Sequence, residues 1–165
     1  MTKIGILSDT HGLLDKRIFT HFAECDEIWH CGDWGSFDVV NCLQVFKPLR
    51  GVFGNIDSYE IRQIFPQHNR FTVENVSVWL THIGGYPGKY APEVQSEIFR
   101  NPPKLFVCGH SHILKVKYDK TLELLHINPG AAGKYGFHLV QTLIRLEIDG
   151  DKIQNLEVVE LDKMG

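Results

Sequence analysis

The first half of the chain alternates between two patterns, and this alternation restricts the fold more than any other feature of the sequence. Short apolar runs, typical of buried strands, occur at 3–9, 27–33 and 49–55. Segments with apolar residues at helical spacing separate these runs, at 14–25 and 36–46. Because a β-α-β-α-β order favours right-handed crossovers between parallel strands, we expect a parallel sheet here.

The second half changes to pairs of apolar runs joined by short polar turns, which predict antiparallel hairpins. The hairpins are expected at 70–82, 114–128 and 136–161. A helix with Pro92 in its first turn is predicted at 91–101, and a further strand at 104–110. We therefore expect one domain over residues 1–165, with an α/β fold in which two stacked sheets of mixed strands are flanked by helices.

Composition excludes several classes of function. The net charge is only -3 and Lys and Arg do not cluster, which argues against a dedicated nucleic-acid surface. No apolar stretch approaches the roughly 20 residues of a membrane span, and Asp9 and His11 interrupt the N-terminus too early for a signal peptide. The four cysteines form no C-x-x-C pair and are interpreted as reduced, mostly buried thiols. We expect a cytoplasmic protein.

Nearly every predicted core strand ends in a residue type that binds metal ions. These residues are Asp9, His11, Asp33, Asn55, His82, His110 and His112. Ligands of α/β sheets bind beyond the carboxyl ends of the strands, so five separate segments deliver candidate ligands to one edge. Spacing of i and i+2 in extended chain puts Asp9 with His11, and His110 with His112, on a common side. Glycines at 32, 54 and 109 permit close approach of the backbone.

Each of these motifs alone has an ordinary explanation. "SDTHG" and "GNID" are also typical of turns or helix N-caps, and His82 alone is more often a hydrogen-bonded histidine at a strand end. The joint arrangement favours a metal site. Two divalent ions with two carboxylates and a bridging hydroxide leave about one positive charge, which suits a phosphate monoanion. Mixed N and O ligands favour Mn, Ni, Fe, Zn or Co over Mg and Ca.

The order D-x-H, G-D, G-N-x-D, H and G-H-x-H resembles the calcineurin-like metallophosphoesterases. "SDTHG", "GNID", "GHSH" and "INPGA" are similar to the small prokaryotic phosphodiesterase branch of that superfamily, which also includes a retromer scaffold subunit that has lost ligands. The resemblance covers residues 4 to 132. It implies a four-layer α-β-β-α sandwich with a dinuclear metal site, Mn being the first choice of metal.

The resemblance also implies a role for each matched residue. Asp9, His11 and His112 would hold one ion, Asn55, His82 and His110 the other, and Asp33 would bridge them. A bridging hydroxide would attack phosphorus in line, with Asp33, Asn55 and His82 as the catalytic residues and Asn55 and His11 also contacting the substrate.

Three further positions, beside the matched motifs, modify this expectation. Many superfamily members carry a His that protonates the leaving group where this chain has Ile56, so we expect good leaving groups or another proton source. Asp57 is expected to support the site by orienting a ligand imidazole. Asn128 is expected either to fix the 110–112 loop by hydrogen bonds or to form a plain Asn-Pro turn.

The expected function is metal-dependent hydrolysis of phosphoric esters, most of all phosphodiesters, with a small phosphorylated substrate. The alternatives are a phosphomonoesterase, a two-metal hydrolase of another ester, and a non-catalytic binding or scaffold protein on the same fold. A homodimer or higher oligomer is compatible with the sequence. "IGGYPGKY" at 83–90 is interpreted either as a rim of the substrate pocket or as a plain connector.

Overall fold

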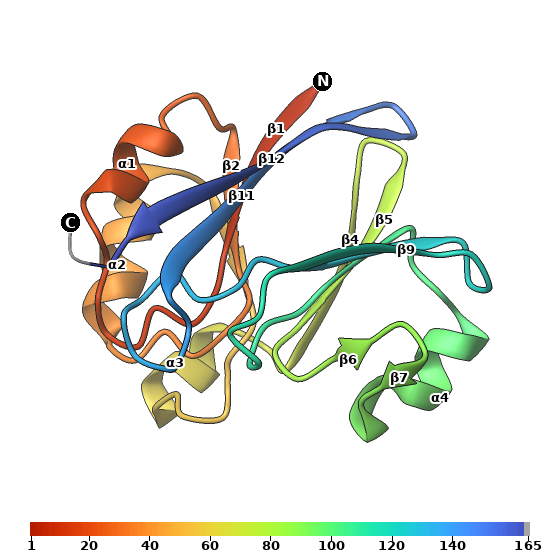
Figure 1. The fold of residues 1–165 in the computed structure, drawn as a ribbon, viewed down its shortest axis with the longest axis horizontal. Coiled ribbons are helices and arrows are strands. Elements are labelled where there is room, and N and C mark those ends of the chain that lie inside the picture. The colour runs from red at the N-terminus through yellow and green to blue at the C-terminus, as the bar shows by residue number, and fades with distance from the viewer. Residues whose placement is uncertain (164–165) are drawn as a thin grey trace.

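The computed structural model describes residues 1–163, and two five-stranded sheets form its centre (Figure 1). The strands of the first sheet are, in spatial order, β12 (Lys152–Asp162), β11 (Val140–Asp149), β1 (Thr2–Leu7), β2 (Glu27–His30) and β3 (Leu49–Gly51). Those of the second sheet are β4 (His68–Val73), β5 (Val76–Thr81), β8 (Leu105–Val107), β10 (Leu124–Asn128) and β9 (Lys115–Asp119).

Both sheets mix parallel and antiparallel pairs, as the sequence predicts. Strands β1, β2 and β3 are parallel, and β11 and β12 extend that sheet as an antiparallel hairpin. In the second sheet β5, β8 and β10 are parallel, with β4 and β9 antiparallel at its edges. Because β1, β2 and β3 run the same way, their carboxyl ends meet at one edge, and the same holds for β5 and β8.

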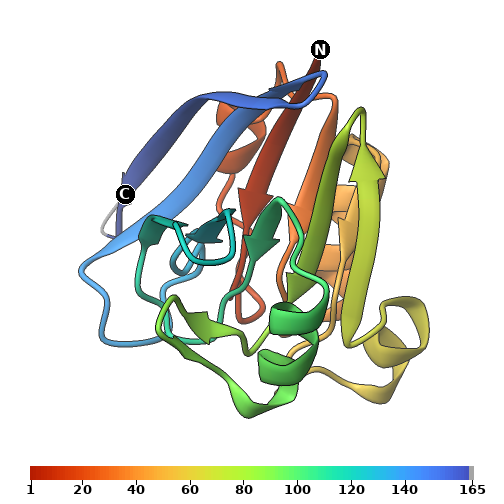
Figure 2. The same ribbon diagram turned by 90° about the vertical axis from the view of Figure 1, so that its right-hand side faces the viewer.

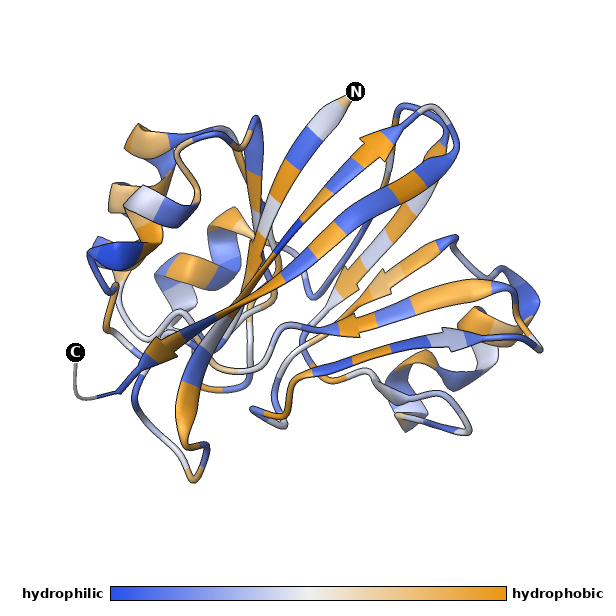
Figure 3. Ribbon diagram, turned by 45° about the horizontal axis from the view of Figure 1, so that its top comes forward, coloured by the Kyte–Doolittle hydropathy of each residue, from blue (hydrophilic) through white to orange (hydrophobic). Residues whose placement is uncertain are grey.

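Helices cover the outer faces of the sheets (Figures 1 and 2). They are α1 (Arg17–His21), α2 (Phe37–Phe46), α3 (Tyr59–Ile64) and α4 (Pro92–Arg100). Apolar residues fill three layers: Ile4 and Leu80 lie between the two sheets, Leu43 of α2 packs under the first sheet, and Val94 of α4 packs under the second. The strands alternate hydrophobic and hydrophilic residues accordingly (Figure 3). This arrangement confirms the expected four-layer sandwich.

Two helices differ from the expectation. The helix predicted at 14–25 shortens to α1, because the Asp15 side chain accepts the backbone N–H of Arg17 in a turn, and no side chain caps the helix at Lys16. Helix α3 was not predicted from its short apolar pattern. Its signal is Ser58, whose hydroxyl accepts the N–H of Ile61 at 3.4 Å as an N-cap.

The glycine-rich segment at 83–90 is an ordered two-stranded ribbon of β6 (Gly85–Tyr86) and β7 (Lys89–Tyr90), turning at Pro87 and Gly88. Among residues 1–163, no helix has both the length and the apolar character to cross a membrane.

Candidate metal centre

The structure brings all seven predicted ligand residues to one edge of the two sheets. They follow β1, β2, β3, β5 and β8, whose carboxyl ends meet there. Two groups of potential ligand atoms form, each within 4.8 Å: Asp9, His11 and His112 in one, Asp33, His82 and His110 in the other. Asn55 joins the second group, because its Oδ1 lies 3.1 Å from His110 Nδ1. We call these the first and second clusters.

Asp9 is completely buried, and its two carboxylate oxygens have different surroundings. Oδ2 accepts the Ser8 hydroxyl at 2.7 Å and the His110 backbone N–H at 3.1 Å. Oδ1 accepts no hydrogen bond from residues 1–163 and lies 3.2 Å from His112 Nε2. Burial raises the pKa of this carboxyl, but the nearby rings of His11, His112 and His82 outweigh that effect and leave the pKa well below its usual value. An ionised oxygen is thus presented to the first cluster.

Asp33 belongs to the second cluster and also faces the first. Its Oδ1 accepts the backbone N–H of Ile56 at 3.1 Å. Its Oδ2 is 3.2 Å from Nε2 of His82 in the second cluster and 3.6 Å from Nε2 of His11 in the first. Burial raises the pKa of Asp33, but the contact with His82 lowers it below the usual value. The carboxylate therefore has the position expected of a bridge.

The histidines direct free ring nitrogens toward these carboxylates. His82 Nδ1 lies 2.7 Å from the Cys31 carbonyl oxygen, to which it donates, so Nε2 is left as the lone-pair nitrogen that a metal ion needs. The Nε2 atoms of His11 and His82 are buried without a hydrogen-bond partner among residues 1–163. Together with Asp9 Oδ1 they form a buried, unsatisfied set of N and O donors, which divalent transition metals fit.

The backbone is distorted where it carries these ligands. Five candidate ligands have φ between 48° and 73°, in the left-handed region: Asp9, His11, Asp33, His110 and His112. Such conformations are unfavourable for non-glycine residues and concentrate at functional sites. Two predicted glycines provide room instead: a Cβ on Gly54 would lie 2.1 Å from Asp33 Oδ1, and one on Gly109 would lie 2.2 Å from Ser8 Oγ. The chain is shaped to bring these groups together.

Comparison with known proteins identifies the family. The model of the calcineurin-like phosphoesterase superfamily domain matches residues 2–151. This chain belongs to that superfamily. It is 28% identical over 156 residues to a probable metallophosphoesterase of Methanothermobacter thermautotrophicus, covering 91% of this chain and 88% of the relative. The recognition of the family from the sequence motifs is confirmed.

Solved structures of this superfamily fold are also similar. A structure described as a novel archaeal phosphodiesterase is 21% identical with a TM-score of 0.76, over 95% of this chain and 99% of that chain. Vps29 of Entamoeba histolytica complexed with Zn²⁺ is 15% identical with a TM-score of 0.71, over 98% and 99% of the two chains. At these identities the likeness establishes the fold alone.

In this calcineurin-like chain, Asp57 contacts backbone rather than an imidazole. Its buried carboxylate accepts three N–H groups, from Asp33 at 2.9 Å and Gly54 at 2.7 Å on Oδ2, and from Gly35 at 3.1 Å on Oδ1. The expectation that Asp57 orients a ligand ring is therefore corrected: it ties together the two loops that carry Asp33 and Asn55. The physical reason is that the "GNID" turn folds its own carboxylate inward, over the neighbouring N–H groups.

Asn128 has both of the contacts considered from the sequence. Its Nδ2 donates to the Gly109 carbonyl and to the Ser111 hydroxyl, each at 3.0 Å, which holds the loop between His110 and His112. Its Oδ1 accepts the Gly130 N–H at 3.0 Å in an Asn-Pro turn. The loop and the turn are thus parts of one hydrogen-bonded unit.

Several neighbours of the clusters were not predicted. Ser8 precedes the first ligand in "SDTHG" and could have been inferred from that motif. The Tyr135 ring stacks on the His11 ring with 4.9 Å between the ring centroids, and the centroids of the His138 and His112 rings are 5.4 Å apart. These two come from the loop before β11, which carries no ligand motif, so only the fold could place them. His30, in contrast, is fully buried, and its ring stacks on that of Trp34.

Proposed function

We propose that this protein is a metal-dependent phosphodiesterase with a dinuclear centre. Asp9, His11 and His112 would hold one divalent ion and Asn55, His82 and His110 the other. Asp33 would be shared between them. Ions bound there would polarise phosphoryl oxygens and lower the pKa of a coordinated water. Membership of the superfamily supports metal-dependent phosphoester hydrolysis; the number of ions, their identity and the diester preference are our proposals.

The observation that carries this proposal is a set of potential metal-ligand atoms in the two clusters that have no hydrogen-bond partner. Asp9 Oδ1, His11 Nε2 and His82 Nε2 are all buried without hydrogen bonds from the described part of the chain. Leaving such groups unpaired costs about 1–3 kcal/mol each, so a folded protein retains them where a ligand satisfies them. Imidazole and carboxylate donors together favour Mn first, with Ni, Fe, Zn and Co as alternatives.

A diester preference follows from charge and from the residue at position 56. Two divalent ions with Asp9 and Asp33 and a hydroxide have about one net positive charge, matched by the single negative charge of a phosphodiester. Ile56 is 48% exposed and has no group that can donate a proton. We therefore expect esters whose leaving alcohol departs without protein protonation, such as aryl esters.

The test is hydrolysis of bis(4-nitrophenyl) phosphate by protein loaded with Mn²⁺ or Ni²⁺, with metal content measured in parallel. We expect turnover and about two ions per chain, and loss of both turnover and bound metal in Asp33→Ala. Asp151→Ala removes an exposed carboxylate in a surface turn and should behave as the original protein. No turnover with any divalent metal, or full metal binding by Asp33→Ala, would contradict the proposal.

A second candidate is a non-catalytic binding protein, favoured by exposed apolar side chains beside the first cluster. Tyr135, Phe137 and Leu139 are 71%, 104% and 89% exposed, and Tyr135 stacks on His11. The same assay separates the two functions, because a binding protein would retain metal without turning over any phosphoester.

A further inference from the structure

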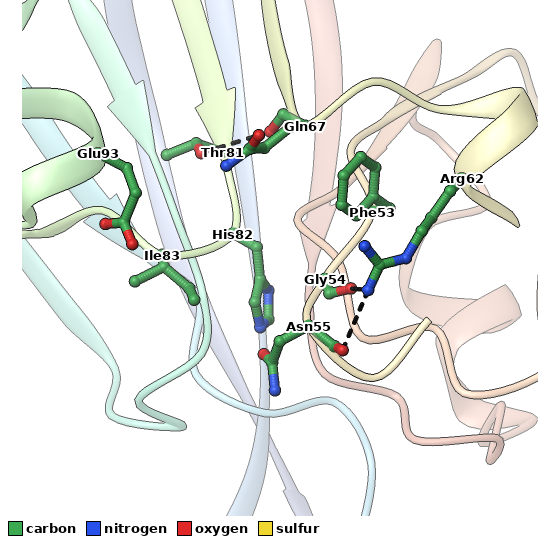
Figure 4. Close-up of a pocket in the computed structure, with 9 residues that line it drawn as sticks. All are labelled: Phe53, Gly54, Asn55, Arg62, Gln67, Thr81, His82, Ile83 and Glu93. Atoms are coloured by element: carbon green, nitrogen blue, oxygen red, sulfur yellow. Dashed lines mark hydrogen bonds between the residues drawn. The ribbon is translucent and has the colours of Figure 1, made fainter. Parts of the chain in front are cut away.

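A pocket of about 290 Å³ adjoins the second cluster, with Asn55 and His82 at one end (Figure 4). Its walls come from different parts of the fold. Phe53 and Arg62, from β3's carboxyl end and from α3, form one wall. Ile83 and Glu93, from the segment after β5 and from α4, form the opposite wall, as Figure 4 shows. A group esterified to a phosphate at the metal centre would extend into this space.

Three exposed side chains of this pocket, Arg62, Gln67 and Glu93, have polar groups without a hydrogen-bond partner among residues 1–163, although Glu93 also interacts electrostatically with His68. The Glu93 carboxylate and the Gln67 amide make no hydrogen bond or ion pair with residues 1–163. Nε and Nη2 of Arg62 donate to carbonyl oxygens of the 54–57 turn, which fixes the guanidinium, while no bond of Nη1 occurs within the described chain. The pocket thus offers a pure acceptor on one wall, a pure donor on the other, and an amide that does both.

This combination selects a particular chemistry. Hydroxyl groups both donate and accept, so they satisfy a carboxylate and a guanidinium together. A second anionic group would be repelled by Glu93, and a cationic group would be repelled by Arg62. Each of these charges therefore favours an uncharged group in the pocket. The Phe53 ring, which the Arg62 guanidinium covers at 4.5 Å, and the Ile83 side chain leave apolar surface for a carbon skeleton.

We propose that this pocket binds the uncharged polyhydroxy alcohol of a phosphodiester, such as a glycerol or sugar group, and that Glu93 determines this specificity. The inference rests on the proposed phosphodiesterase function and deepens it by naming the ester group. Glu93 accepts the hydroxyl hydrogen atoms, and Arg62 donates to their oxygen atoms. Glu93 contacts the substrate away from the reacting phosphorus, so it contributes to substrate recognition and not to the chemical step.

The test compares three diesters that share the 4-nitrophenyl leaving group and differ in the second ester: 2,3-dihydroxypropyl, propyl and 2-carboxyethyl. We expect kcat/KM for the dihydroxypropyl ester to exceed that for the propyl ester by about tenfold or more, from hydrogen bonds to a charged group. The carboxyethyl ester should be the poorest. Glu93→Gln should reduce the ratio of kcat/KM between the dihydroxypropyl and propyl esters, mainly by raising KM for the dihydroxypropyl ester. It should also raise kcat/KM for the carboxyethyl ester relative to the propyl ester.

The control is Glu160→Gln, which makes the same charge change at an exposed site on β12, at the opposite edge of the first sheet, and should leave all ratios unchanged. Equal hydrolysis of the three esters, or ratios that Glu93→Gln leaves unaltered, would overturn the pocket assignment while the phosphodiesterase function stands. If the protein hydrolyses neither these three esters nor bis(4-nitrophenyl) phosphate, the proposed function is overturned, and the pocket assignment with it.

Discussion

Replacement of Asp57 by Asn should test how the loops of the metal centre are held. The Asp57 carboxylate is 5% exposed and accepts N–H groups of Asp33, Gly54 and Gly35. The single oxygen of an Asn side chain can still accept the N–H groups of Asp33 and Gly54. The NH₂ group of the amide then faces the Gly35 N–H, which is also a donor. One charge-assisted bond is lost and two become neutral.

The expected cost follows from these bonds. A hydrogen bond to a charged group contributes about 1.5–3 kcal/mol and a neutral one about 0.5–1.5 kcal/mol, so Asp57→Asn should lower the free energy of unfolding by roughly 3–5 kcal/mol. Urea denaturation of the metal-free protein at pH 7.5 measures this quantity. Asp151→Asn is the matched control, since its exposed carboxylate should contribute within about 0.5 kcal/mol.

Metal binding provides a second measurement of the same change. Because Asp57 joins the loops of Asp33 and Asn55, the variant should also bind divalent metal more weakly, by about tenfold or more. A loss of unfolding free energy below about 1 kcal/mol, together with unchanged metal affinity, would refute the reasoning that this carboxylate organises the site.

Three further changes test other parts of the structure. Gly136→Ala should weaken metal binding at the first cluster about tenfold in a metal titration, because φ is +128° and a Cβ would lie 2.4 Å from His112 Nδ1; unchanged affinity would argue against this contact. Burial lowers the pKa of His30 to about 3, so the stability that its neutral ring contributes is complete above pH 6.5 and is lost as the pH falls from 6.5 toward 3. Between pH 7.5 and 5 the original protein should lose roughly 2 kcal/mol more unfolding free energy than His30→Gln, and parallel pH profiles would contradict this. Ser58→Ala should cost about 1 kcal/mol in urea denaturation, because the hydroxyl accepts the Ile61 N–H at the start of α3; a cost near zero would show that the cap is not needed.

Much of the fold could be predicted because its signals are local. The alternation of apolar runs and helical segments predicted the parallel strands β1, β2 and β3, and polar turns predicted the three hairpins. The prediction was less accurate for short helices. Helix α1 covers only part of its predicted range, and α3 was missed, because a helix of five or six residues depends on caps and packing more than on periodicity.

The sequence by itself determined which residue types stand at the strand ends, and hence the family and the candidate ligands, because ligand chemistry is a property of the chain. The expectation that extended i, i+2 spacing aligns the paired ligands is wrong: Asp9, His11, His110 and His112 all have positive φ, and His110 and His112 lie in different clusters. The tertiary structure decided how they are supported. It placed Asp33 between His11 and His82, turned Asp57 toward backbone N–H groups, and stacked Tyr135 on His11. These contacts join segments far apart in sequence, so they follow from the packing of two sheets and from no local pattern.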